Sequence, residues 1–99
     1  MKLYAIMRRH GWETPTDLQL AAERSGRIGN EEMSDQVRWI RSYVLAEDDG
    51  SLGTICIYEA TDPEAIREHA SRAFLPSDEV IPVAETVVMR PDPVPAATT

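Results

Sequence analysis

Residues 52–73 read LGTICIYEATDPEAIREHASRA, and this stretch decides the fold. Its first half is short, rich in β-branched and aromatic residues, and predicts a strand over residues 52–59. Asp62 then supplies an N-cap, and Pro63 is suited to the first position of a helix. The stretch therefore predicts a strand followed at once by a helix that runs from Pro63 to about Ala73.

The flanking sequence supplies four more elements. Strands are predicted over residues 2–9, 37–45 and 80–89, and Thr14-Pro15 begins a helix that reaches about Ile28. Glu47-Asp48-Asp49-Gly50 predicts a hairpin turn between two of the strands. The resulting order, β-α-β-β-α-β, predicts an α+β ferredoxin-like fold. Right-handed crossovers then place both helices on one face of a four-stranded antiparallel sheet.

The composition fits one small domain. The chain has 99 residues with 10 Lys+Arg and 17 Asp+Glu, a net charge of −7. We expect a single domain over residues 1–90 and a disordered proline-rich tail over residues 91–99. The acidic balance argues against partners that need clustered positive charge, so we expect no nucleic acid and no membrane surface.

The chain carries no sign of a membrane-spanning or secreted protein. No apolar run approaches the length of about 20 residues that crosses a bilayer, and the first residues lack a signal-peptide pattern. A single cysteine excludes an internal disulfide framework and fits a reducing compartment. We therefore expect a cytoplasmic protein.

The face of the sheet without helices needs a cover, which is either a second protomer or a ligand. The strand alternation predicts that this face is lined by five residues from two strands, and a register shift of one would reverse the assignment. These pocket or interface residues are Trp39, Arg41, Tyr43, Cys56 and Tyr58. Aromatic residues and arginine are enriched at protein interfaces, which favours a homodimer and thus a dimeric α/β barrel.

Two residues are the first candidates for chemistry. His69 has helical spacing with Ile66 and is expected to point toward the sheet, while Glu59 ends the strand before that helix. If the two meet, they form either an acid–base pair or the start of a metal site. The alternative is that His69 is a hydrogen-bonded core residue.

Further metal ligands would have to be brought close by the fold. The candidates are His10, Cys56, Glu85 and Tyr43. Imidazole and carboxylate donors suit nickel, zinc or ferrous iron, and the spacing does not choose among these divalent metals. For Cys56 the alternative is a buried, inert thiol, and for His10 it is a solvated or capping role.

The middle of the chain resembles a known family. The segments VRWIRSYV at 37–44, CIYEA at 56–60 and DPEAIREHA at 62–70 resemble a family of small bacterial proteins classed as a domain of unknown function. The family includes a nickel-binding, nickel-responsive protein with a ferredoxin-like fold that assembles as a dimer. The resemblance implies the fold, the dimer and nickel as cofactor, with Glu59 and His69 as the ligands that the motif carries over.

Three functional hypotheses follow. The first is a nickel-type metal-binding protein whose ligands are His69, Glu59 and His10. The second is a dimeric α/β-barrel enzyme, a cyclase, isomerase or hydrolase, in which His69 is the base, Glu59 orients it and Tyr43 polarises an oxygen of a small-molecule substrate. The third is an interaction module that binds another protein.

Overall fold

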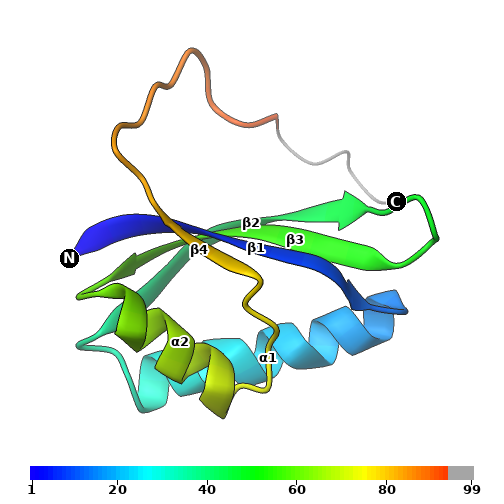
Figure 1. Cartoon of the computed structure of the whole chain (residues 1–99), viewed down its shortest axis with the longest axis horizontal. Coiled ribbons are helices and arrows are strands. Elements are labelled where there is room, and N and C mark those ends of the chain that lie inside the picture. Colours follow the sequence, from blue (N-terminus) through cyan, green and yellow to red (C-terminus); the bar gives the residue numbers. More distant parts are fainter. Residues whose placement is uncertain (94–99) are drawn as a thin grey trace.

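A computed structural model of the chain, which describes residues 1–93, confirms the ferredoxin-like order of elements. The elements are β1 (Lys2–Trp12), α1 (Pro15–Glu31), β2 (Val37–Ala46), β3 (Leu52–Ala60), α2 (Pro63–Arg72) and β4 (Glu79–Pro82). The strands form one antiparallel sheet in the order β2-β3-β1-β4. Both helices cover the same face, and the chain after β4 arches above the other face (Figure 1). We call the face without helices the open face.

Both helices begin where their caps predict. The Thr14 hydroxyl accepts a hydrogen bond from the Asp17 N–H at 3.1 Å, and Pro15 follows it at the start of α1. The Asp62 carboxylate accepts from the Ala65 N–H at 2.8 Å, and α2 begins at Pro63. Side-chain oxygens thus satisfy N–H groups that the first helical turn leaves without a backbone partner.

The predicted fourth strand over residues 80–89 is mostly wrong. The structure pairs only Glu79–Pro82 with β1, and the last ladder contact is the Val83 N–H that donates to the Leu3 carbonyl at 3.0 Å. The register sets Pro82 opposite Tyr4, so only Leu3 and Lys2 of β1 remain beyond this pair, and residues after 84 have no partner on β1. Residues 83–93, which we call the arm, therefore leave the sheet.

The arm overlaps the predicted tail. Residues 91–93 have no regular secondary structure, and the rest of the predicted disordered tail, 94–99, lies outside the described residues. Within the described part, Asp92 accepts hydrogen bonds from Arg41 Nη1 at 2.7 Å and from the Tyr43 hydroxyl at 2.8 Å. These contacts hold the end of the arm against β2.

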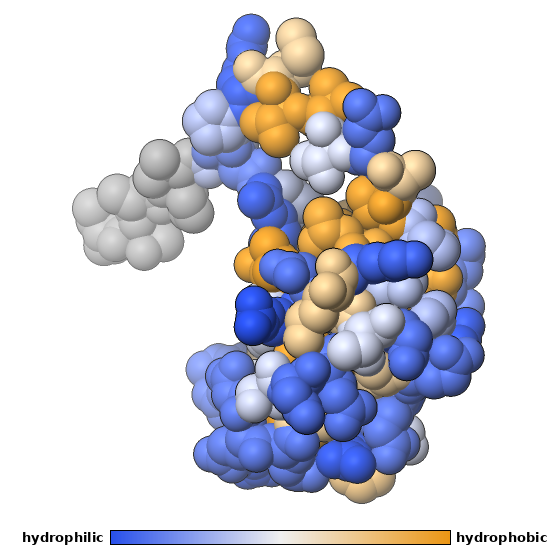
Figure 2. Space-filling view, turned by 90° about the vertical axis from the view of Figure 1, so that its left-hand side faces the viewer, coloured by the Kyte–Doolittle hydropathy of each residue, from blue (hydrophilic) through white to orange (hydrophobic). Residues whose placement is uncertain are grey.

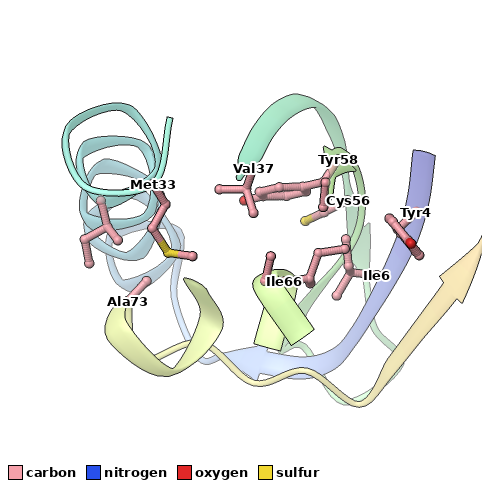
Figure 3. Close-up of a cluster of buried hydrophobic side chains, with 11 residues drawn as sticks. Tyr4, Ile6, Met33, Val37, Cys56, Tyr58, Ile66 and Ala73 are labelled. Carbon is pink, nitrogen blue, oxygen red and sulfur yellow. The ribbon is translucent and has the colours of Figure 1, made fainter. Parts of the chain in front are cut away.

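The hydrophobic core lies between the sheet and the helices (Figure 3). Ile6 comes from β1, Cys56 and Tyr58 come from β3, and Ile66 comes from α2; all four are at most 5% exposed. Alternate residues of each strand supply one wall of this core, as strand geometry requires. None of the helices in residues 1–93 has the length and apolar content that crossing a membrane requires.

The core makes a direct stability prediction. Replacing Ile66, which is 1% exposed, in an Ile66→Ala variant leaves a cavity between α2 and the sheet and is expected to cost about 2–5 kcal/mol of unfolding free energy. The control Leu20→Ala removes an exposed side chain of α1 and should stay within about 0.5 kcal/mol of the native value. Urea denaturation followed by circular dichroism measures both; equal losses in the two variants would contradict the core assignment.

Candidate functional site

His69 lies inside the molecule, as its helical spacing predicts. It is 1% exposed, and its Nε2 lies 3.0 Å from the Ser25 carbonyl oxygen of α1. A carbonyl only accepts, so Nε2 carries the proton and donates, while Nδ1 is buried without a partner among the described residues. Burial lowers the pKa of His69 below 6.5. The ring is therefore neutral at pH 7 and links α2 to α1.

Tyr58 lies at the centre of the same region. Its hydroxyl is 3.0 Å from Ser25 Oγ, and its ring centroid is 5.4 Å from that of His69. The Trp39 ring stacks on the Tyr58 ring with a centroid distance of 6.1 Å and an angle of 7° between planes. Burial raises the pKa of Tyr58 to about 12, so the phenol stays protonated at neutral pH.

The structure does not bring Glu59 and His69 together. Tyr58 points toward the helices, and successive residues of a strand point to opposite faces, so Glu59 points to the open face. There it is paired in register with Leu3 on one side and Arg38 on the other. Tyr43 also lies away from His69, on the open face. The predicted combination of His69, Glu59 and Tyr43 is therefore not assembled within one chain.

The predicted common lining of the open face needs a correction. A bulge interrupts the β2–β3 register between Trp39 and Arg41, so that Trp39 is opposite Tyr58 but Arg41 is opposite Ile57. The extra residue reverses the alternation along β2. The Trp39 side chain consequently faces the helices, on the same side as Cys56 and Tyr58 of β3. Arg41 and Tyr43, after the bulge, remain on the open face.

Cys56 is a buried thiol in a chain of hydrogen bonds. Trp39 Nε1 donates to Ser42 Oγ at 2.8 Å, the Ser42 hydroxyl donates to Cys56 Sγ at 3.0 Å, and the thiol donates to Thr54 Oγ1 at 3.3 Å. The cysteine is 5% exposed. Its place in this chain fits a structural role and not that of a reactive nucleophile.

His10 lies at the other end of β1, beside the β2–β3 hairpin. Its Nδ1 is 3.2 Å from Asp49 Oδ2 and 3.0 Å from Ser51 Oγ. Its backbone N–H donates to Glu47 at 2.8 Å, and Arg9 forms an ion pair with the same carboxylate at 2.7 Å. Glu47 and Asp49 were predicted only as turn residues, and the structure shows that they also fix the end of β1.

These contacts perturb both carboxylates of the hairpin. Hydrogen bonds from the Arg9 guanidinium and from the His10 N–H lower the pKa of Glu47 to about 2. Hydrogen bonds from Ser51 and the nearby His10 lower the pKa of Asp49 to about 2. Both side chains are therefore anionic at any pH near neutrality.

The sequence-derived metal candidates are far from one another. His69 is buried among the helices, Glu59 lies on the open face and His10 lies at the hairpin end. Within residues 1–93 no group of three His, Cys, Asp or Glu side chains is arranged to hold a metal ion. Residues 1–93 of one chain therefore do not fit nickel with protein donors alone.

A cavity of about 190 Å³ lies between α1 and the sheet, beside Tyr58. Its most unusual member is Arg8, which is 1% exposed and was not among the residues predicted to form a site. The signal was present, because Tyr4, Ile6 and Arg8 are spaced two apart and a strand turns such residues to one face. The positive charge of Arg8 favours an exposed position, but the two-residue period of the strand predicts that its side chain faces the core.

Residues 4–83 match the model of a family described as nickel responsive protein SCO4226-like. No curated protein sequence matches significantly. The crystal structure of SCO4226 from Streptomyces coelicolor A3(2) matches 86% of this chain and 99% of that chain, with 20% identity and a TM-score of 0.65. At this level of identity the structural match supports the fold.

The hairpin carboxylate gives a pH prediction. Because the pKa of Glu47 is lowered from 4.5 to about 2 in the folded protein, its ionised form favours folding above pH 4.5, and that contribution is lost as the pH falls toward 2. A Glu47→Gln variant should therefore melt below the native protein at pH 7, and the gap should close between pH 4.5 and 2. Thermal melts across this range test it, with the exposed Glu64→Gln as control. A gap that does not change with pH would contradict the assignment.

Proposed function

The chain belongs to the SCO4226-like family of nickel-responsive proteins, and from this premise we propose that it binds nickel as a homodimer. The observation that carries the proposal is the family match over residues 4–83, which includes every helix and strand apart from the first two residues of β1. The geometry adds two supports: an open face suited to a second copy, and a histidine–carboxylate pair suited to a transition metal.

The open face has the surface that a second copy would cover. Figure 2 shows hydrophobic residues gathered on the side away from the helices, where the arm stands above the sheet. The large apolar residues exposed there include Ile40, Tyr43 and Ile81 on the strands and Val87, Val88 and Met89 on the arm. Hydrophobic surface of this extent on a small chain is typical of an interface.

The charges on the same face favour a copy of this chain over another partner. Arg38 is paired in register with Glu59, and Arg41 forms an ion pair with Asp92 at 2.7 Å. A two-fold interface brings each patch against its own copy. Charged groups can therefore pair across the interface only if the patch carries both signs. The chain as a whole carries −7, and a face with balanced charges limits the repulsion between two copies. Two such sheets facing each other would form a dimeric α/β barrel.

The accessible donors for nickel are His10 and Asp49. The His10 side chain is 49% exposed and that of Asp49 is 61% exposed, and their nearest donor atoms are 3.2 Å apart. Adjacent donors around a metal with bonds of about 2.1 Å lie about 3 Å from each other, so the pair fits one ion. Glu47 faces the other ring nitrogen of His10, at 3.9 Å, and is bound to Arg9. Water or a second copy would supply the remaining donors.

His69 and Glu59, the other two candidates, fit this site less well. His69 is buried with Nε2 committed to the Ser25 carbonyl, and Glu59 lies on the open face without a histidine beside it among the described residues. His10, in contrast, lines a hollow together with Met7 and Ile55 of the open face. A second copy on that face would therefore approach His10.

Titration calorimetry of the tag-free protein with Ni²⁺ tests the metal site. We expect binding at micromolar nickel. Affinity should fall about tenfold or more in His10→Ala, which removes the imidazole donor, and in Asp49→Asn, which removes the negative charge of the second donor. The control is His69→Gln, whose amide keeps a donor for the Ser25 carbonyl and should leave nickel affinity unchanged. Circular dichroism confirms folding of each variant. Loss of binding in a folded His69→Gln with unchanged binding in His10→Ala would place the metal on the helix side instead.

Light scattering tests the dimer. We expect a mass of twice the 11.1 kDa chain, and a shift to the monomer in Ile57→Glu, which places an unpaired charge in the middle of the open face. Leu20→Glu is the matched control, because Leu20 is exposed on α1, on the opposite side of the molecule. A native protein that stays monomeric at high micromolar concentration, with and without Ni²⁺, contradicts this part of the proposal.

A further inference from the structure

A cavity exists beneath α1 because the helix places small side chains opposite large side chains of the sheet and its flanking segments. Ala21, Ala22 and Ser25 form the helix side of the cavity. The sheet and its flanking segments contribute large residues, among them both tryptophans, Trp12 and Trp39. Small residues on the helix and large residues around them leave a hollow of about 190 Å³ that opens to solvent beside the half-exposed Trp39 and Val44. A hollow with mostly apolar walls and a few polar groups is typical of a small-molecule site.

One charged side chain lines this cavity without a counter-ion. Arg8 Nε donates to the Pro76 carbonyl at 2.7 Å, but its Nη2 is buried and has no hydrogen-bond partner among the described residues. None of the ion pairs within residues 1–93 includes Arg8, although its neighbour Arg9 pairs with Glu47. The Tyr58 ring lies 6.0 Å from the guanidinium carbon, which compensates a buried cation only in part. Buried guanidinium groups are normally paired, so this one lacks an anion.

A second donor lies directly opposite the arginine. The register between β1 and β3 pairs Arg8 with Thr54, and both side chains face the helices. Thr54 Oγ1 accepts from the Cys56 thiol, so its own hydroxyl proton is available, and no described residue accepts it. Thr54 is 3% exposed. A buried guanidinium N–H and a buried hydroxyl thus lie on adjacent strands with no acceptor between them.

We propose that this cavity binds a small organic monocarboxylate with an apolar body, its carboxylate held by Arg8 and Thr54 and its body seated between α1 and Trp39. One cation matches one negative charge, and the largely apolar walls disfavour a second charge on the ligand. A cavity of about 150 Å³ accommodates benzene, so 190 Å³ suits a single ring or a branched short chain. The half-exposed Trp39 and Val44 mark the mouth at the edge of β2.

The site differs from the proposed nickel site in both place and chemistry. It lies on the helix side of the sheet, whereas His10 and Asp49 lie at the hairpin. Experiments on metal-free protein therefore test it independently of nickel binding.

Tryptophan fluorescence provides the first test, because both tryptophans of the chain line the cavity. Metal-free full-length protein is titrated with benzoate, phenylacetate and 3-methylbutanoate, and with benzyl alcohol and benzylamine as neutral and cationic counterparts. We expect saturable binding of at least one carboxylate at millimolar concentration, and binding at least tenfold weaker for its counterparts. No response to any carboxylate, or equal binding of benzyl alcohol, would overturn the proposal.

Arg8→Met separates a ligand-binding arginine from a structural one. The variant keeps an apolar chain of similar length and removes the unpaired charge. Carboxylate affinity should fall about thirtyfold or more, since loss of one partner of a buried charge pair is costly. The melting temperature without ligand should change little, because removal of the unpaired charge offsets the loss of the hydrogen bond to the Pro76 carbonyl. Unchanged carboxylate affinity, or a lower melting temperature with no effect on affinity, contradicts the proposal.

A cavity-filling variant tests the location without touching Arg8. Ala22→Leu on the half-buried side of α1 should abolish carboxylate binding, while Glu23→Leu, the neighbouring exposed position, should retain it. Circular dichroism of both variants confirms an intact fold. Binding that persists in a folded Ala22→Leu variant shows that the carboxylate binds elsewhere.

Discussion

The side chain of Tyr58 connects every layer of this small protein. Its hydroxyl meets Ser25 of α1 at 3.0 Å, its ring contacts His69 of α2, and Trp39 of β2 stacks on it. Arg8 of β1 lies over the ring at 6.0 Å. One phenol therefore fixes the distance of both helices from the sheet. An aromatic ring can do this because it supplies a large apolar surface together with one polar atom that still finds a partner.

The orientation of Tyr58 also determines which residues lie on each face of the sheet. Since Tyr58 points toward the helices, Glu59 must point to the open face, together with Ile57. The helix side thus collects neutral or buried groups around a cavity, and the open face collects exposed hydrophobic residues with charges of both signs. The first arrangement suits a small ligand, and the second suits another protein surface. A single strand alternation therefore separates the two surfaces in space.

More of the fold than of the candidate site could be predicted from the sequence. The caps at Thr14 and Asp62 act over three residues, so both helix starts could be predicted from local chemistry. The inward position of His69 followed from helical spacing in the same way. The end of β4 could not be predicted, because it depends on where its partner β1 begins in the register. The bulge after Trp39 was hidden for a similar reason, since it exists only in the pairing with β3.

Residue type and short-range spacing were enough to predict the order of the elements, the family and the candidate donors His10, Glu59 and His69, but not Asp49, which reads as a turn residue. Only the tertiary structure decided which donors meet. It separated His69 from Glu59 by the thickness of the sheet, brought His10 to Asp49 across 39 positions of the chain, and buried Arg8 opposite Thr54. Those relations depend on strand register, in which a shift of one residue moves every side chain to the other face.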